Sequence, residues 1–206
     1  MMDEAKELMS GDDTGINERI ARQVRELRAV RGDTLDALAA RCGVSRSMIS
    51  LIERGATSPT AVVLEKLAGG LGVSLARLFG GESEGEAAQP LVRRAQQSQW
   101  RDPESGYLRR SLSPPGWSSP IQLVEVEFPA GARVAYETGG RDKAVQQQVW
   151  IIQGRIDIRL GDALHVLHKG DCLAMRLDQP LVYSNPTAQA ARYLVAICDE
   201  LVTLCA

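Results

Sequence analysis

The chain has 206 residues, a formal net charge of −2 and 44% hydrophobic residues, enough for one large domain or two small ones with a packed core. It contains no run of about 18 apolar residues, and its acidic N-terminus lacks the apolar core of a secretory signal. Its four cysteines form no CxxC pair and have no zinc-knuckle spacing, and so few cysteines in a chain of this length do not indicate a disulfide framework. These features predict a soluble cytoplasmic protein without a membrane segment.

The charge is unevenly distributed along the chain. Residues 1–16 carry one Lys and five acidic groups, residues 17–80 carry ten Arg or Lys against six acidic groups, and residues 81–206 carry thirteen basic and fifteen acidic groups. The middle segment is therefore the basic one. Basic groups neutralise phosphate and supply most non-specific affinity for nucleic acid, although solvated helix faces also carry such charge.

The N-terminal segment is expected to be a flexible tail. Residues 1–16 have few large apolar groups and contain two glycines, Gly11 and Gly15, a composition typical of mobile termini. A first helix is predicted from Asn17 onward. Its apolar side is expected to comprise Ile20, Val24 and Leu27.

Residues 34–55, TLDALAARCGVSRSMISLIERG, predict two short helices joined by a tight turn. Thr34 and Ser45 are suited to cap the two helix starts, and Gly43 can adopt the left-handed conformation that ends the first. The expected apolar faces comprise Leu35, Leu38, Ala39, Met48, Ile49 and Ile52. The spacing fits a DNA-binding pair of helices and an ordinary helical hairpin equally well.

Two more helices complete the predicted helical domain. One follows Pro59 and ends at Gly72, and a short one covers residues 75–79. Five helices with short connections predict a compact all-α domain over residues 17–80. The Gly-rich, acidic residues 81–90 then predict a linker.

The sequence AARCGVSRSMISLIERG resembles the helix-turn-helix of lambda-repressor-like regulators of the xenobiotic-response-element (XRE) family, over roughly residues 18–79. The matching positions are Ala39, Gly43, Val44, Ser45, Ile49, Ile52, Glu53 and Gly55. The resemblance implies that the second helix of the pair binds DNA. It also implies that Arg28 pairs with Glu53 and connects the first helix to the third.

The outward positions of that second helix are short polar or basic groups, which suit the major groove of DNA. Arg46 is expected to bind guanine bidentately, and Leu51 to contact a thymine methyl group. The predicted DNA-binding residues are Thr34, Ser45, Arg46, Ser47, Ser50, Leu51 and Arg54. Because one such domain buries little surface, we expect a homodimer on double-stranded DNA with a palindromic operator.

From Leu91 onward the hydrophobic pattern changes to a period of two. Residues 121–128, IQLVEVEF, alternate over eight positions, and turn residues recur about every 8–12 positions. The stretches FPAGARV, VWIIQGRIDIRLG and HKGDCLAMRLDQPLVYSN resemble a cupin, a small antiparallel jelly-roll barrel, which would cover residues 91–206. The matching anchors are Gly131, Gly154, Gly170, Asp171, Pro180 and Asn185. The two resemblances together imply a bacterial transcriptional regulator with a cupin sensor domain.

The resemblance to cupins does not extend to their metal ligands. Counting from the glycine anchors, the positions where catalytic cupins place His and Glu hold Glu137, Gly139, Gln147 and Leu181. The two histidines, His165 and His168, are three apart on a predicted strand and so face opposite sides. The sequence therefore predicts no metal, no cofactor and no catalytic residues.

The interior of the predicted barrel is either a filled core or a pocket for a small-molecule effector. The alternation of side chains along the strands predicts a lining of Arg133, Glu137, Gln147, Val149, Leu181 and Tyr183. We thus expect a regulator, not an enzyme, whose cupin domain binds an effector, dimerises, or both. Two alternatives are a metal-dependent cupin oxygenase or epoxidase fused to a helix-turn-helix, and an antitoxin-like DNA-binding protein with a polypeptide partner.

Overall fold

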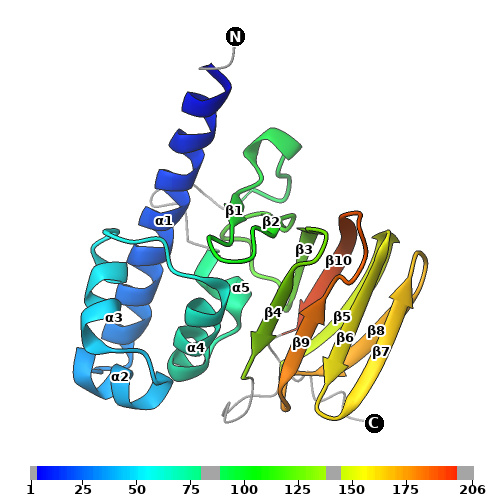
Figure 1. The fold of residues 1–206 in the computed structure, drawn as a ribbon. Helices are drawn as coiled ribbons and strands as arrows, with labels where there is room; N and C mark the ends of the chain where they lie inside the picture. The colour runs from blue at the N-terminus through cyan, green and yellow to red at the C-terminus, as the bar shows by residue number, and fades with distance from the viewer. Residues whose placement is uncertain (1–3, 80–88, 138–144, 199–206) are drawn as a thin grey trace.

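The computed structural model describes residues 4–79, 89–137 and 145–198. A helical part (residues 4–79) lies beside a β part (residues 89–198), as Figure 1 shows. The helices are α1 (Glu4–Val30), α2 (Leu35–Cys42), α3 (Arg46–Glu53), α4 (Ala61–Leu71) and α5 (Leu75–Phe79). The prediction of five helices is confirmed. No helix in the described ranges is long and apolar enough to cross a membrane.

The prediction that the first helix begins at Asn17 is wrong, because α1 begins at Glu4 and includes residues 4–16. A glycine inside a helix costs only about 1 kcal/mol relative to Ala. Gly11 and Gly15 therefore do not suffice to end α1 when the chain on both sides favours a helix. Ile16 is buried and so joins this extension to the core.

Hydroxyl side chains cap α2, α3 and α4, as the sequence pattern predicts for the first two. Thr34 accepts a hydrogen bond from the Ala37 N–H at 3.1 Å, and Ser45 accepts one from the Met48 N–H at 3.2 Å. Gly43 ends α2 with a φ of 66°. The fully buried side chains of this part include Ile20, Val24, Leu38, Ile49, Leu64 and Leu67. The capped helix starts and the shared core thus fix the angle between α2 and α3.

The β part consists of two antiparallel sheets. One has the order β1-β2-β3-β10-β5-β8 and the other β4-β9-β6-β7. The strands are β1 (Gln99–Arg101), β2 (Leu108–Ser111), β3 (Ile121–Phe128), β4 (Arg133–Tyr136), β5 (Gln146–Gln153), β6 (Arg155–Leu160), β7 (Ala163–His168), β8 (Cys172–Arg176), β9 (Leu181–Ser184) and β10 (Ala191–Cys198). The sheets face each other, because the Tyr183 ring of β9 stacks on the Tyr193 ring of β10 at 5.9 Å. The predicted cupin-like jelly roll is confirmed.

The two parts share one core. Figure 1 places α4 next to β4, with α2 and α3 on the side away from the sheets. The Phe79 ring of α5 lies 5.3 Å from the Trp100 ring of β1, and Trp100 lies 5.7 Å from Tyr107. Most of the predicted linker falls outside the described residues. The two parts therefore contact each other through residues that precede the predicted linker and residues that follow it.

Candidate nucleic-acid interface and interior cavity

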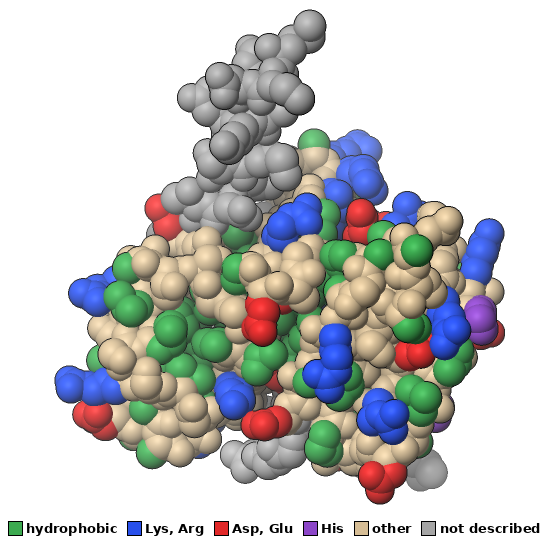
Figure 2. All heavy atoms as spheres, viewed as in Figure 1, with side chains coloured by type: hydrophobic (Ala, Val, Ile, Leu, Met, Phe, Trp, Pro, Cys, Tyr) green, Lys and Arg blue, Asp and Glu red, His purple; other side chains and the backbone are tan. Residues whose placement is uncertain are grey.

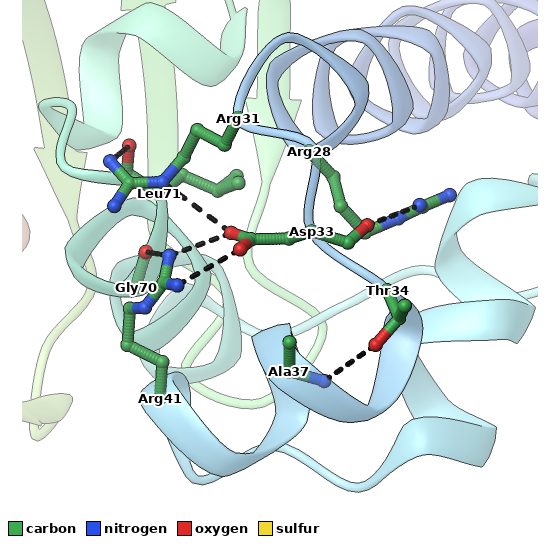
Figure 3. Close-up of polar contacts among 8 residues, drawn as sticks. All are labelled: Arg28, Arg31, Asp33, Thr34, Ala37, Arg41, Gly70 and Leu71. Carbon is green, nitrogen blue, oxygen red and sulfur yellow. Dashed lines mark hydrogen bonds and ion pairs between the residues drawn. The ribbon is translucent and has the colours of Figure 1, made fainter.

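The connection between α1 and α2 is held by three arginines (Figure 3). Arg41 donates two hydrogen bonds to the Asp33 carboxylate, at 2.6 and 2.9 Å, and Arg31 approaches the same carboxylate at 3.4 Å. Arg28 donates to the Asp33 carbonyl oxygen at 2.9 Å. The hydrogen bond from Arg41 lowers the pKa of the Asp33 carboxyl below its ordinary value. The start of α2, at Thr34, is therefore fixed to α1.

The predicted pair of Arg28 and Glu53 is present and bidentate. The Arg28 Nε and Nη2 atoms donate to the two Glu53 carboxylate oxygens at 2.6 and 2.8 Å. Glu53 is buried, and Arg25 also donates to its carbonyl oxygen. The hydrogen bonds to the Glu53 carboxylate raise the pKa of Arg28 above its ordinary value. The last residue of α3 is thus tied to α1, as the helix-turn-helix resemblance implies.

These contacts use a substantial share of the basic groups that the sequence places in this segment. Arg25, Arg28, Arg31 and Arg41 all make hydrogen bonds inside the helical part. On the face of the molecule seen in Figure 2, Lys and Arg side chains are scattered among acidic ones and form no single basic patch. These four arginines are therefore occupied, and the basic groups that a nucleic acid could contact are better sought on α3.

The predicted DNA-binding residues lie on one accessible surface. Ile49 and Ile52 face the core, whereas Arg46, Ser47, Leu51 and Arg54 are exposed and Ser50 is half-buried. Arg46 makes an ion pair with Asp36 at 3.4 Å, in which both side chains are largely exposed. Thr34 and Ser45 are exposed at the starts of α2 and α3. The structure thus brings the predicted residues together around α3.

The family model for the helix-turn-helix, HTH_3, matches residues 24–78, which contain both capped helices and the exposed face of α3. Residues 24–78 therefore form an HTH_3, or XRE-type, helix-turn-helix domain. The chain is 28% identical over 170 residues to the HTH-type transcriptional regulator SutR of Escherichia coli (strain K12), covering 82% of this chain and 89% of SutR. It also resembles the crystal structure of an HTH_3 family transcriptional regulator from Vibrio cholerae, with a TM-score of 0.71 and 24% identity over 90% of this chain and 98% of that one. This structural match shows that the two-part fold recurs as a whole.

The β part contains a cavity of about 70 Å³ between its sheets and the helix-turn-helix domain. Of the six residues predicted to line a pocket, three do so: Gln147, Leu181 and Tyr183. Val149 is fully buried but does not line the cavity.

The prediction that Arg133 and Glu137 face inward is wrong, because both are exposed and neither lines the cavity. Glu137 instead pairs with Lys66 of α4 at 3.4 Å. On β4 the inward residues are Val134 and Tyr136. The count from Gly131 assigned the inward side to the odd-numbered residues of this segment, whereas the even-numbered residues of β4 face inward. A shift of one residue moves every side chain of a strand to the other face.

All four tyrosines of the chain line the cavity: Tyr107, Tyr136, Tyr183 and Tyr193. Gln147 Nε2 donates a hydrogen bond to the Tyr183 hydroxyl at 2.6 Å, and the hydroxyls of Tyr107 and Tyr136 lie 3.3 Å apart. Burial raises the pKa of each tyrosine above its ordinary value. The cavity is therefore lined by neutral phenols.

Several cavity residues were not predicted from the sequence. Arg109 and Tyr107 come from β2 and the residue before it, while Glu65, Ser74 and Leu75 come from the helix-turn-helix domain. Strand β2, Leu108–Arg109–Arg110–Ser111, is short and carries two charges, so no alternation marks it. No group of three His, Cys, Asp or Glu residues suited to a metal ion occurs in the described ranges. His165 is half-buried and His168 is exposed on β7.

Proposed function

We propose that the protein is a sequence-specific DNA-binding transcriptional regulator that acts as a homodimer and responds to a small molecule bound in the β part. The observation that carries this proposal is the exposed face of α3, held in place by the Arg28–Glu53 pair behind it. A recognition helix presented in this way enters the major groove, where each base pair offers a distinct pattern of donors and acceptors. The similarity to SutR over most of both chains supports the same function.

Arg46 is the proposed base reader. Its ion pair with Asp36 is exposed, and such pairs contribute at most about 1 kcal/mol. A guanine can therefore replace Asp36 at little cost and offer the guanidinium two acceptors, O6 and N7. Ser47 and Ser50 would bond to base edges or phosphate, and Leu51 would contact a thymine methyl group.

Phosphate contacts are assigned to the ends of the helices. The Thr34 and Ser45 hydroxyl oxygens accept capping hydrogen bonds, and the hydroxyl hydrogen of Thr34 remains available for a phosphate oxygen. Arg54 is exposed at the end of α3, where its Nε donates to the Ser50 carbonyl at 3.2 Å. These contacts would set the register of the domain on the duplex without reading its sequence.

The outer face of the six-stranded sheet is the proposed dimer interface. Ile121 and Leu123 of β3 are 52% and 36% exposed, and Trp150 of β5 is 48% exposed. Strand β10 lies between β3 and β5, where Leu194 pairs with Trp150 and Ala196 with Leu123. Contiguous exposed apolar surface of this kind marks interaction sites on soluble proteins. A dimer formed there would present two recognition helices to a palindromic operator.

Binding of the protein to an operator sequence selected from random DNA tests the proposal. Sequences bound by the full-length protein would be isolated from a random DNA pool, and affinities measured by fluorescence anisotropy and footprinting. Loss of one bidentate base contact costs about 1–3 kcal/mol per half-site, so Arg46→Ala should weaken specific binding by at least about tenfold. Non-specific binding should change far less.

The matched control is Arg159→Ala, which removes an exposed arginine from β6, outside the helix-turn-helix domain. It should bind the selected operator as the unmodified protein does. Both variants should melt at the unmodified temperature, because both side chains are exposed. Wild-type affinity of Arg46→Ala for the selected operator would show that α3 is not the reading helix.

A further inference from the structure

Arg109 is a buried cation in the interior cavity. It lies on β2, is 6% exposed and lines the cavity. Its guanidinium carbon sits 4.6 Å from the centre of the Phe79 ring. Among the described residues, no carboxylate lies within the 4.0 Å ion-pair limit of this guanidinium, and its Nε has no hydrogen-bond partner. Glu65 lines the same cavity but is not within that distance.

The surroundings of Arg109 do not compensate for its burial. Removal of an ion from water costs several kcal/mol even after the protein relaxes, whereas a cation–π contact returns about 2 kcal/mol. Desolvation accordingly lowers the pKa of Arg109 below its ordinary value. Because a guanidinium nevertheless stays charged in proteins, an uncompensated positive charge remains at the cavity wall. An anion in the cavity would supply the missing partner.

The tyrosine hydroxyls add hydrogen-bond donors to this charge. The Tyr183 oxygen accepts from Gln147, so the Tyr183 hydroxyl hydrogen points elsewhere, and the structure records no acceptor for it in the described ranges. Between Tyr107 and Tyr136, a single hydrogen bond uses only one of two hydroxyl hydrogens. The raised pKa values keep these phenols protonated, and hence donors, at neutral pH.

The size and walls of the cavity restrict the occupant. A volume of about 70 Å³ corresponds to roughly five water-sized groups when one water needs about 10–15 Å³. The rest of the lining is apolar and includes Val126, Phe128, Leu181, Val195 and Ile197. Such a space suits a few carbon atoms attached to one charged group.

We propose that this cavity binds a small organic anion, a short-chain carboxylate, with Arg109 as its counter-ion. The planar guanidinium matches the two oxygens of a carboxylate, and the phenols complete its hydrogen bonds. Glu65, Ser74 and Leu75 of the helix-turn-helix domain form part of the same wall. The ligand therefore contacts both parts of the protein, and its role as an effector rests on the proposed function above.

The test compares acids with their neutral amides. The melting temperature and the binding heat of the full-length protein would be measured with propionate and lactate, against propionamide, lactamide and equal concentrations of sodium chloride. The acids should raise the melting temperature by about 5–10 °C at a hundred times their Kd. They should also change the near-ultraviolet tyrosine spectrum, because every tyrosine of the chain lines the cavity.

Arg109→Met removes the charge and keeps a long apolar side chain. It should bind the acids about 10- to 100-fold more weakly. Arg133→Met is the matched control, because Arg133 is exposed outside the cavity, and it should bind the acids as the unmodified protein does. Loss of cooperative melting in Arg109→Met would mean that the variant does not fold. In that case the comparison of acids with amides on the unmodified protein decides whether the cavity binds an anion.

Three outcomes would overturn the proposal: no carboxylate stabilises the unmodified protein, the amides stabilise it equally, or Arg109→Met binds the acids with unchanged Kd. Operator binding is measured on the same samples. If the acids bind but no operator is selected, the regulator proposal fails and the anion site stands. If an operator is bound and the acids are not, the anion site fails alone.

Discussion

Replacement of Asp102 by Ala tests whether the helix-turn-helix domain and the β part form one unit. Asp102 lies directly after β1 and is 2% exposed. Its Oδ1 accepts a hydrogen bond from the Ala61 N–H at 2.9 Å, at the first residue of α4. Its Oδ2 accepts from the Ser105 N–H at 2.9 Å and from the Ser105 hydroxyl. A residue of the β part therefore caps a helix of the other part.

The expected loss follows from these contacts. Removal of a capping side chain costs about 1 kcal/mol, and each buried N–H left without a partner costs about 1–3 kcal/mol. Thr60 still accepts from the Val63 N–H at 3.4 Å, so α4 keeps part of its cap. The total for Asp102→Ala is therefore about 2–4 kcal/mol. At about 2–4 °C per kcal/mol for a chain of this size, the melting temperature should fall by roughly 5–15 °C.

Calorimetry and amide hydrogen exchange measure the effect. Asp102→Ala should lower the melting temperature and speed exchange at the Ala61 amide, while Asp102→Asn, which keeps one oxygen acceptor, should lose less. Asp162→Ala is the control, because Asp162 is exposed in the turn between β6 and β7.

If Asp102→Ala melts within about one degree of the unmodified protein, or if the Ala61 amide exchanges at an unchanged rate, Asp102 does not hold the two parts together. The capping reading would then be wrong, even though the aromatic contacts across the two parts remain.

Three further predictions concern stability. Arg28→Ala leaves the Glu53 carboxylate buried without its bidentate partner and should lower the free energy of unfolding in urea by about 2–4 kcal/mol, whereas an unchanged value would mean that the pair contributes nothing. Gly70→Ala places a Cβ 2.6 Å from the Cys42 Cβ and should destabilise the protein by about 1–3 kcal/mol. Gly69→Ala places its Cβ in open space and should stabilise the protein by about 0.5–1 kcal/mol. Equal melting temperatures of the two variants would contradict this contrast. The tyrosines have a raised pKa when folded, so their stabilisation is complete below about pH 10 and is lost as the pH rises further. Alkaline melting should therefore coincide with phenolate absorbance, and ionisation well before unfolding would contradict the burial.

The sequence was most informative where local chemistry determines the structure. Capping hydroxyls at Thr34 and Ser45 and a left-handed glycine at Gly43 mark helix ends within a few residues, whatever packs against them. Strict alternation over residues 121–128 likewise matches the bounds of β3. The Arg28–Glu53 pair was predicted from the family resemblance, because its partners are 25 positions apart and no local pattern links them.

The features that the sequence did not reveal depend on contacts between distant segments. Strands β1 and β2 are three and four residues long, so they are too short to show a period of two. The interior position of Arg109 follows from the packing of α5 over β2, and a charged residue on a short strand is ordinarily expected at the surface. In the sequence, Asp102 likewise resembles an ordinary turn residue, and only the structure shows that it accepts a hydrogen bond from Ala61.

The packing of α4 indicates how an occupant of the cavity would reach the DNA. Glu65 of α4 lines the cavity, and the same helix packs so closely on α2 that Gly70 leaves no room for a Cβ beside Cys42. Close-packed helices move as bodies because their interfaces tolerate little compression. A ligand that displaces α4 would therefore turn the whole helix-turn-helix domain relative to the β part and leave the angle between α2 and α3 unchanged. In a dimer joined through the β parts, that rotation changes the distance between two recognition helices, so the expected effect is on operator spacing and affinity and not on the bases that Arg46 reads.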